Sequence, residues 1–200
     1  VVVGTNLLNA GGTPYQVTQV VWHQAYNPQL ITNDIALLKT KTVIAFRDNQ
    51  IQSIGLKGEE PAAGKEATVV GWGAPMAGSL GNNQLIQEDA SHPRNITNLL
   101  TALKVTVKPK SNCGGDAKTK VDASKICALV GKPKGMCHGD FGGPLVYDGS
   151  LVGIASDYVR EDLGGQFSDC GNGEPLLFTS TVSFASWIQD TMKNSPKPSC

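Results

Sequence analysis

The chain has 200 residues, of which 17 are Lys or Arg and 17 are Asp or Glu, so its formal net charge is zero. This length allows one large domain or two small ones with a sizeable apolar core. The neutral balance argues against nucleic acid or an anionic membrane as the main partner. The 23 glycines and 11 prolines favour an all-β fold with many turns, and no apolar run is long enough to span a membrane.

Alternation of apolar and polar residues predicts a series of strands along the chain. The predicted strands are 1–5, 15–22, 33–38, 64–72, 99–107, 151–154 and 176–182, with another after the glycine-rich turn that precedes Val146. Residues 74–98 are rich in Gly, Asn and Pro, which predicts a long loop. Residues 182–193 change to helical spacing, and this predicts one amphipathic helix with an apolar face of Phe184, Trp187, Ile188 and Met192.

The cysteines favour disulfides over a metal site. They are Cys113, Cys127, Cys137, Cys170 and Cys200. No pair has Cys-x-x-Cys spacing and the three histidines are scattered, so we expect no metal site. Disulfides indicate an oxidising compartment, and we expect Cys200 to be the one left over. Asn95-Ile96-Thr97 is a sequon, so Asn95 is a candidate glycosylation site.

The stretch Cys137-His138-Gly139-Asp140-Phe141-Gly142-Gly143-Pro144-Leu145-Val146 resembles the nucleophile loop of the chymotrypsin-like serine proteases. Other motifs follow in family order: Val3-Gly4-Thr5, Asn33-Asp34-Ile35-Ala36-Leu37-Leu38, Gly71-Trp72-Gly73 and Ile126-Cys127. Each motif alone is weak, but their ordered set is strong. The resemblance covers nearly the whole chain and is closest to insect digestive chymotrypsins.

The resemblance implies an all-β fold of two six-stranded antiparallel β-barrels, the first incomplete, and a C-terminal α-helix. The expected divisions are 1–73 for the remnant of the first barrel, 74–98 for a connecting loop, 99–181 for the second barrel and 182–200 for the helix and tail. It also implies the disulfides Cys113–Cys127 and Cys137–Cys170, each stabilising the fold by roughly 2–4 kcal/mol.

The catalytic residues of the family are not all matched. The family has a serine where this chain has Phe141, and a phenyl ring is not a nucleophile. Losing that nucleophile costs about a millionfold in kcat. The Ala-Ala-His-Cys motif that carries the family's histidine is absent from the sequence, and we expect no catalytic role for His23, His92 or His138. Asp34 resembles the triad aspartate and is expected to be vestigial, held by backbone hydrogen bonds if buried.

The specificity pocket of the family is also altered. Tyr158, in Ser156-Asp157-Tyr158, takes the place of one pocket glycine, and Leu176 takes the place of another. The resemblance therefore implies a pocket filled by Tyr158 and Leu176 and capped by Phe141. Gly135, at the pocket floor, carries no charge, so selectivity for basic substrates is not implied.

Family chains begin before the position matched by Val1, and their N-terminus pairs with the aspartate matched by Asp140. The front part is either a separate cleaved chain, or omitted from the sequence, or truly absent; if it is absent, Asp140 needs another partner. The loops at 74–98 and 159–169 are longer than is usual in the family and are expected at the rim of the cleft. They either carry function or are tolerated insertions.

We expect a secreted protein that is not an enzyme, needs no cofactor and acts by binding a serine protease or another secreted protein. The first hypothesis is a serine protease inhibitor or regulator that presents Lys57, Lys132 or Lys134 on a surface loop. An alternative is a non-inhibitory immune or ligand-binding module. A third is a residual serine endopeptidase with another nucleophile, although the sequence suggests no Ser–His or Cys–His pairing.

Overall fold

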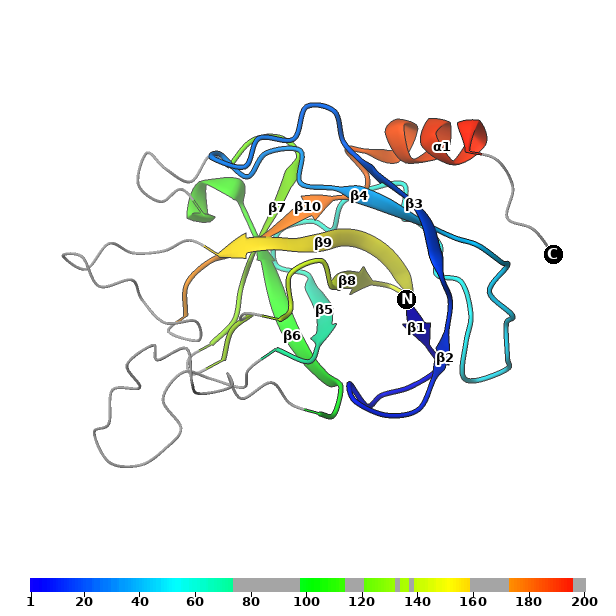
Figure 1. Ribbon diagram of the computed structural model, residues 1–200. Coiled ribbons are helices and arrows are strands. Elements are labelled where there is room, and N and C mark those ends of the chain that lie inside the picture. The colour runs from blue at the N-terminus through cyan, green and yellow to red at the C-terminus, as the bar shows by residue number, and fades with distance from the viewer. Residues whose placement is uncertain (74–97, 114–120, 132–133, 137–138, 159–172, 196–200) are drawn as a thin grey trace, which may run out of the picture.

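The computed structural model describes residues 1–73, 98–113, 121–131, 134–136, 139–158 and 173–195. Its main body is a closed antiparallel barrel, flanked by two small sheets and one C-terminal helix (Figure 1). The predicted all-β class with a six-stranded barrel and a C-terminal helix is confirmed.

Six strands close the barrel in the order β10-β7-β6-β5-β8-β9. They are β5 (Glu66–Gly71), β6 (Thr101–Lys108), β7 (Lys125–Leu129), β8 (Pro144–Tyr147), β9 (Ser150–Tyr158) and β10 (Leu176–Ser180). The strand β5 pairs with both β6 and β8. The sequence analysis assigned residues 1–73 to the first barrel. Because β5 lies within that range and belongs to the closed barrel, the start of this barrel lies at or before residue 66 and not after residue 73.

The barrel core follows from the alternation of side chains along each strand. Val105 and Val107 on β6 are 1% and 4% exposed and point into the barrel core with Leu176 and Phe178 of β10. Leu177, between them on β10, faces the opposite way and packs against Cys113 and Cys127. The strand β10 is therefore buried on both faces, which explains its continuous apolar run.

The hairpin between β8 and β9 has a two-residue turn. Tyr147 pairs with Ser150, and the intervening Asp148 and Gly149 both have positive φ, at 49° and 69°. Asp-Gly suits this turn because both residues tolerate left-handed backbone, which matches the twist of the flanking strands. The strand predicted at 151–154 is thus the start of the longer β9.

The N-terminal segment forms two two-stranded sheets. The strands β1 (Val2–Val3) and β2 (Thr13–Pro14) make one, and β3 (Val17–Trp22) and β4 (Ala36–Thr40) make the other. These described strands do not close into a first barrel. The outer face of β3 and β4 is apolar and open to solvent, with Val20 48%, Trp22 66% and Leu38 57% exposed.

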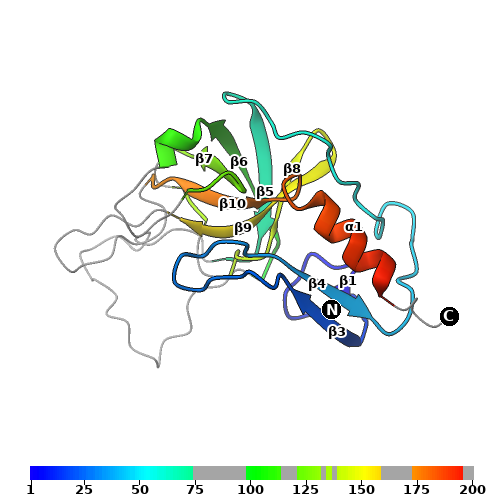
Figure 2. The same ribbon diagram turned by 90° about the horizontal axis from the view of Figure 1, so that it is seen from above.

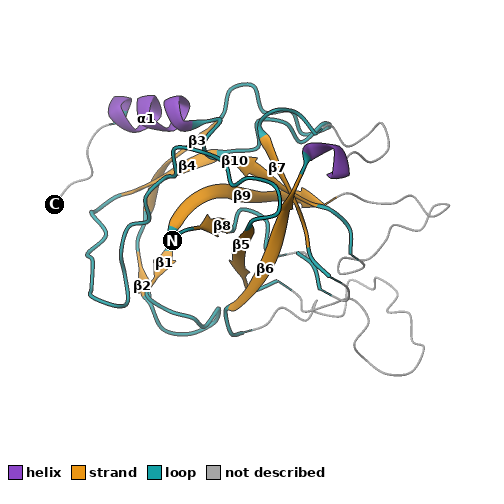
Figure 3. Ribbon diagram, turned by 180° about the vertical axis from the view of Figure 1, so that it is seen from behind, coloured by secondary structure: helices purple, strands orange, loops and turns teal. Residues whose placement is uncertain are grey.

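The helix α1 (Ala185–Asn194) packs on the barrel side of this small sheet (Figure 2). Ile35, just before β4, forms a buried cluster with Phe184 and Ile188. The predicted helix is confirmed, but Met192, which the periodicity placed on its apolar face, is 65% exposed. Seen from behind, α1 lies at the edge of the stranded body (Figure 3).

Cys113, at the end of the short 3-10 helix η1 (Lys110–Cys113), forms a disulfide with Cys127 on β7. The two Cα atoms are 5.8 Å apart. The resemblance implied this pairing. The other cysteines, Cys137, Cys170 and Cys200, lie outside the described residues.

Candidate functional site

The turn that matches the nucleophile loop is anchored by its own backbone and by one carboxylate. Gly139 and Gly142 have φ of 100° and 84°, values at which a Cβ is strained. The Gly142 N–H donates to the Ala155 carbonyl at 2.7 Å, and the Ala155 N–H donates back to the Gly143 carbonyl at 2.8 Å. The turn is therefore attached directly to β9, whatever side chain it carries.

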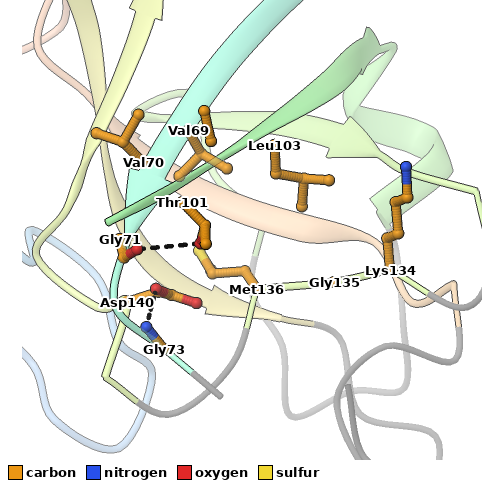
Figure 4. A pocket seen from close by; sticks show the side chains of 11 residues that line it. Val69, Val70, Gly71, Gly73, Thr101, Leu103, Lys134, Gly135, Met136 and Asp140 are labelled. Atoms are coloured by element: carbon orange, nitrogen blue, oxygen red, sulfur yellow. Dashed lines mark hydrogen bonds between the residues drawn. The ribbon is translucent and has the colours of Figure 1, made fainter. Parts of the chain in front are cut away.

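Asp140 supplies the second anchor. Its carboxylate accepts a 2.8 Å hydrogen bond from the Gly73 N–H (Figure 4). A Cβ on Gly71 or Gly73 would collide with this carboxylate, which explains why the Gly71-Trp72-Gly73 motif needs both glycines. The sequence analysis left open which partner Asp140 has within this chain. The backbone amide of Gly73 is one such partner.

A cavity of about 220 Å³ lies beside this anchor, between β5, β6 and the chain at 134–136. Figure 4 shows Val69, Leu103 and Met136 on its apolar wall, Asp140 at one side and Lys134 at the other. Such a space could hold a small molecule with an apolar body and polar ends. Gly135 lines it as well, whereas Phe141 and Leu176 do not.

The predicted pocket-filling residues have different environments. Leu176 is 2% exposed and packs in the barrel core, whereas the side chain of Phe141 is 39% exposed. Residue 158 lies directly across from Leu176 in the antiparallel pairing of β9 and β10. The side chain of Tyr158 is not described. The filled pocket therefore stays a prediction, and Leu176 is buried in the barrel core.

The clearest polar cluster in the described structure was missed by the sequence analysis. Lys125 on β7 is 1% exposed, and its Nζ donates to Ser156 Oγ at 2.7 Å and to Thr179 Oγ1 at 3.1 Å. Ser156 Oγ in turn donates to Asp34 Oδ2 at 2.7 Å. Asp34 is thus held by the hydroxyl of Ser156, which itself accepts a hydrogen bond from Lys125. These are side-chain bonds, whereas the sequence analysis expected backbone hydrogen bonds to Asp34.

Burial controls the electrostatics of this cluster. Loss of solvent lowers the pKa of Lys125 below its ordinary 10.5, and the nearby carboxylates of Asp34, Asp122 and Asp157 oppose this effect. Because the hydroxyl hydrogen of Ser156 goes to Asp34, its oxygen is not activated as a nucleophile by the lysine in this arrangement. The cluster is built to hold groups in place.

His23 has a packing role in the described structure. Its ring lies 5.2 Å from the rings of both Phe184 and Trp187, and its Nδ1 accepts a 3.2 Å hydrogen bond from the Ala25 N–H. The other histidines, His92 and His138, lie outside the described residues. Among the residues that the structure describes, no group of His, Cys, Asp and Glu side chains could hold a metal ion.

The candidate inhibitory lysines differ in availability. The Nζ of Lys57 is 2.7 Å from Asp148 Oδ2 and 5.6 Å from the centre of the Tyr147 ring. The hydrogen bond to Asp148 raises the pKa of Lys57, and the same bond lowers the pKa of Asp148. Lys57 would have to leave this pair to enter a target pocket, which makes it a weaker candidate.

Lys134 is exposed, and its backbone N–H donates to the Gly131 carbonyl at 3.2 Å. Lys132 and the sequon residue Asn95 lie outside the described residues. No helix among the described residues has the length and apolar character needed to cross a membrane.

Comparison with known proteins agrees with this architecture. The family model described as trypsin matches residues 1–188. The chain is 30% identical to trypsin beta of Drosophila erecta and 31% identical to trypsin delta of Drosophila melanogaster, each over 188 residues. These alignments cover 92% of this chain and 65% of each relative, so the chain spans about two thirds of their length.

Brachyurin of the crab Leptuca pugilator is 30% identical over 174 residues, covering 87% of this chain and 67% of that protein. Among solved structures, neuropsin, a serine protease expressed in the limbic system of mouse brain, superposes with a TM-score of 0.71 at 27% identity. That match covers 89% of this chain and 71% of neuropsin. On sequence and on fold, the chain belongs to the trypsin family of chymotrypsin-like serine proteases.

Proposed function

We propose that this chain is a non-catalytic member of the trypsin family that works by binding other proteins. One observation carries the proposal. The nucleophile turn keeps its anchors at Asp140, Gly142 and Gly143, yet the residue at its reactive position is Phe141. The turn is therefore formed without a group that could attack a carbonyl carbon. Asp34 is engaged by Ser156 and Lys125, which gives it a role in the fold.

Within this proposal, the binding target is a serine protease and the mode is inhibition through a surface loop. An inhibitor that imitates a substrate must present a side chain suited to the target's primary pocket on an exposed and rigid turn. Lys134 meets this requirement better than Lys57, because Lys134 is exposed whereas Lys57 is paired with Asp148. Trypsin-like proteases, which accept Lys, are the expected targets.

Two assays of the purified chain test the proposal. The first incubates it with fluorogenic peptides that carry basic, aromatic or small residues before the reporter. We expect no turnover above the buffer control. Turnover that is kept after repurification would contradict the non-catalytic assignment and restore the endopeptidase hypothesis.

The second assay titrates the chain at micromolar excess into trypsin-like, chymotrypsin-like and microbial serine proteases. We expect inhibition of a trypsin-like enzyme, weakened about 30-fold or more by Lys134→Ala because the anchor residue dominates such interfaces. Lys193→Ala, on the last turn of α1, is the matched control and should inhibit as the original chain does. If no protease is inhibited, the inhibitory mode is wrong, and a non-protease partner recovered from the native fluid would support the alternative ligand-binding module.

We also propose that the protein is secreted. The buried Cys113–Cys127 disulfide supports this, because such bonds persist in oxidising compartments. Fractionation of cells that express the native gene, followed by thiol labelling, tests it. The chain should be found outside the cell with these two cysteines unreactive; an intracellular pool in which they label readily would refute secretion.

A further inference from the structure

The polar cluster at Lys125 joins the segment that carries β3 and β4 to the barrel. Other parts of the N-terminal segment meet the barrel through backbone hydrogen bonds, such as the one from the Lys57 N–H to the Leu151 carbonyl. Asp34 belongs to the N-terminal segment, immediately before β4, whereas its partners belong to the barrel: Ser156 to β9, Lys125 to β7 and Thr179 to β10. The neighbouring apolar contact is the cluster of Ile35 with Phe184 and Ile188.

The hydrogen bonds at Lys125 define the position of Asp34 on the barrel more narrowly than the apolar cluster around Ile35 does. Apolar packing is non-directional, whereas each hydrogen bond in the cluster requires a donor and an acceptor within about 3 Å and close to linear. A carboxylate placed where Asp34 lies is acceptor-only and needs donors. Ser156 provides one donor, and the bond that its oxygen accepts from Lys125 helps to orient the hydroxyl toward Asp34.

We propose that Lys125, Ser156 and Asp34 form a polar lock that fixes the β3–β4 segment on the barrel, with Lys125 as its positioning residue. The lock orders the segment more than it stabilises the whole fold. Taking an ammonium group out of water is costly, and a well-packed apolar replacement of a buried charge is often neutral or stabilising overall. What the apolar replacement loses is the directional chain of bonds.

The charged groups around the ammonium agree with this role. Asp34 faces it from the N-terminal segment, Asp122 from the chain before β7 and Asp157 from β9. All three carboxylates raise the pKa of Lys125 and so offset part of the effect of burial. Replacing the lysine removes a positive charge from a cluster of carboxylates, which makes the position of Asp34 electrostatically less favourable.

Hydrogen exchange of the intact chain measures whether the segment is locked. The reporters in the segment are the His23 N–H, which donates to the Ile35 carbonyl, and the amides that pair β3 with β4. The reporters in the barrel are the amides that pair β5 with β6. In Lys125→Met, which keeps the length of the side chain, we expect the segment amides to exchange about tenfold faster and the barrel amides to keep their rates.

Lys104→Met is the matched control. Lys104 is also on a barrel strand, but it is solvent-exposed and 3.6 Å from Glu66. We expect this variant to leave both sets of amides unchanged. Equal acceleration of the segment and barrel amides in Lys125→Met would overturn the lock, because the lysine would then affect global stability. No acceleration of the segment amides would also overturn it, because the lysine would then not order the segment.

A double-mutant cycle adds a second readout. If the residues act as one unit, Ser156→Ala, Lys125→Met and the double variant should accelerate the segment amides by similar factors, far short of multiplicative. Multiplicative effects would mean that the residues act independently and would also overturn the lock. Ser156→Ala keeps the test usable if the lysine variant does not fold.

The pH dependence of stability distinguishes a buried ammonium from simple packing. A lysine with a lowered folded pKa binds fewer protons in the folded chain than in the unfolded chain between that pKa and 10.5. Unfolding therefore becomes less favourable as pH rises through this window, so the original chain should gain in melting temperature relative to Lys125→Met. The same pH profile for both chains would show that the group is not buried as described.

Discussion

The barrel and the N-terminal segment use similar residues with different results. Val105 on β6 is 1% exposed, whereas Val20 on β3 is 48% exposed. Each barrel strand has a neighbour on both sides, while β3 and β4 pair with each other in a two-stranded sheet. A closed sheet encloses one face completely, and a two-stranded sheet cannot. The difference teaches that burial in this chain depends on sheet closure and not on residue type.

The largest expected effect comes from the barrel's covalent link. Replacing Cys113 and Cys127 together by Ala opens a loop with a sequence separation of 14. We expect a loss of about 3 kcal/mol in the free energy of unfolding, because the unfolded chain gains entropy. Urea denaturation of the oxidised chain and of the double variant measures it. If the loss is near zero, the stability of the barrel does not depend on this link.

A matched pair of substitutions tests the comparison itself. Val105→Ala should cost about 2 kcal/mol, because it leaves a cavity in a core that cannot fully collapse. Val20→Ala should change the stability by less than about 0.5 kcal/mol, because the side chain is already half in water. Both are measured by urea denaturation at the same protein concentration. Equal losses would show that another chain or segment covers the outer face of β3 and β4 in solution.

The smallest expected effect is at the surface of the barrel, in the pair of Lys57 and Asp148. The Asp148 side chain is 73% exposed and the Lys57 side chain 23% exposed, so solvent screens the pair. Lys57→Met should therefore lower the melting temperature only slightly, and salt should erase the difference. Because the pKa of Asp148 is lowered, its contribution is present above its unfolded pKa and is lost as pH falls through the folded value. Because the pKa of Lys57 is raised, its contribution is lost as pH rises through its folded value. A difference that persists at both extremes of pH would exclude the ion pair as its cause.

The sequence predicted the barrel better than the site. Strand positions follow from alternation, which is local. The strands predicted at 15–22 and 176–182 contain β3, which lies outside the barrel, and β10, which lies within it. The ends of the strands were less accurate, because pairing partners determine them. The assignment of β5 to the first barrel failed for the same reason, since its neighbours β6 and β8 come later in the chain.

The lock at Lys125 could not be found from the sequence. A lysine side chain is usually solvated, and the alternation of apolar and polar residues predicted no strand over residues 125–129. Its partners Ser156 and Thr179 are 31 and 54 residues away, and the Ser156–Asp34 bond spans 122 residues. The available signal was indirect: the resemblance placed Asp34 at the position of the triad aspartate, and a carboxylate at that position needs hydrogen-bond donors.

The anchoring of the nucleophile turn has an evolutionary consequence. The bonds described for it run through the Asp140 carboxylate and the main chain of residues 142, 143 and 155, and none of these bonds uses the side chain of residue 141. A lineage could exchange the reactive side chain there without a passage through misfolded intermediates. Catalytic activity could therefore be lost from this fold while the fold itself is kept. The remaining scaffold would then stay available for selection on what it binds.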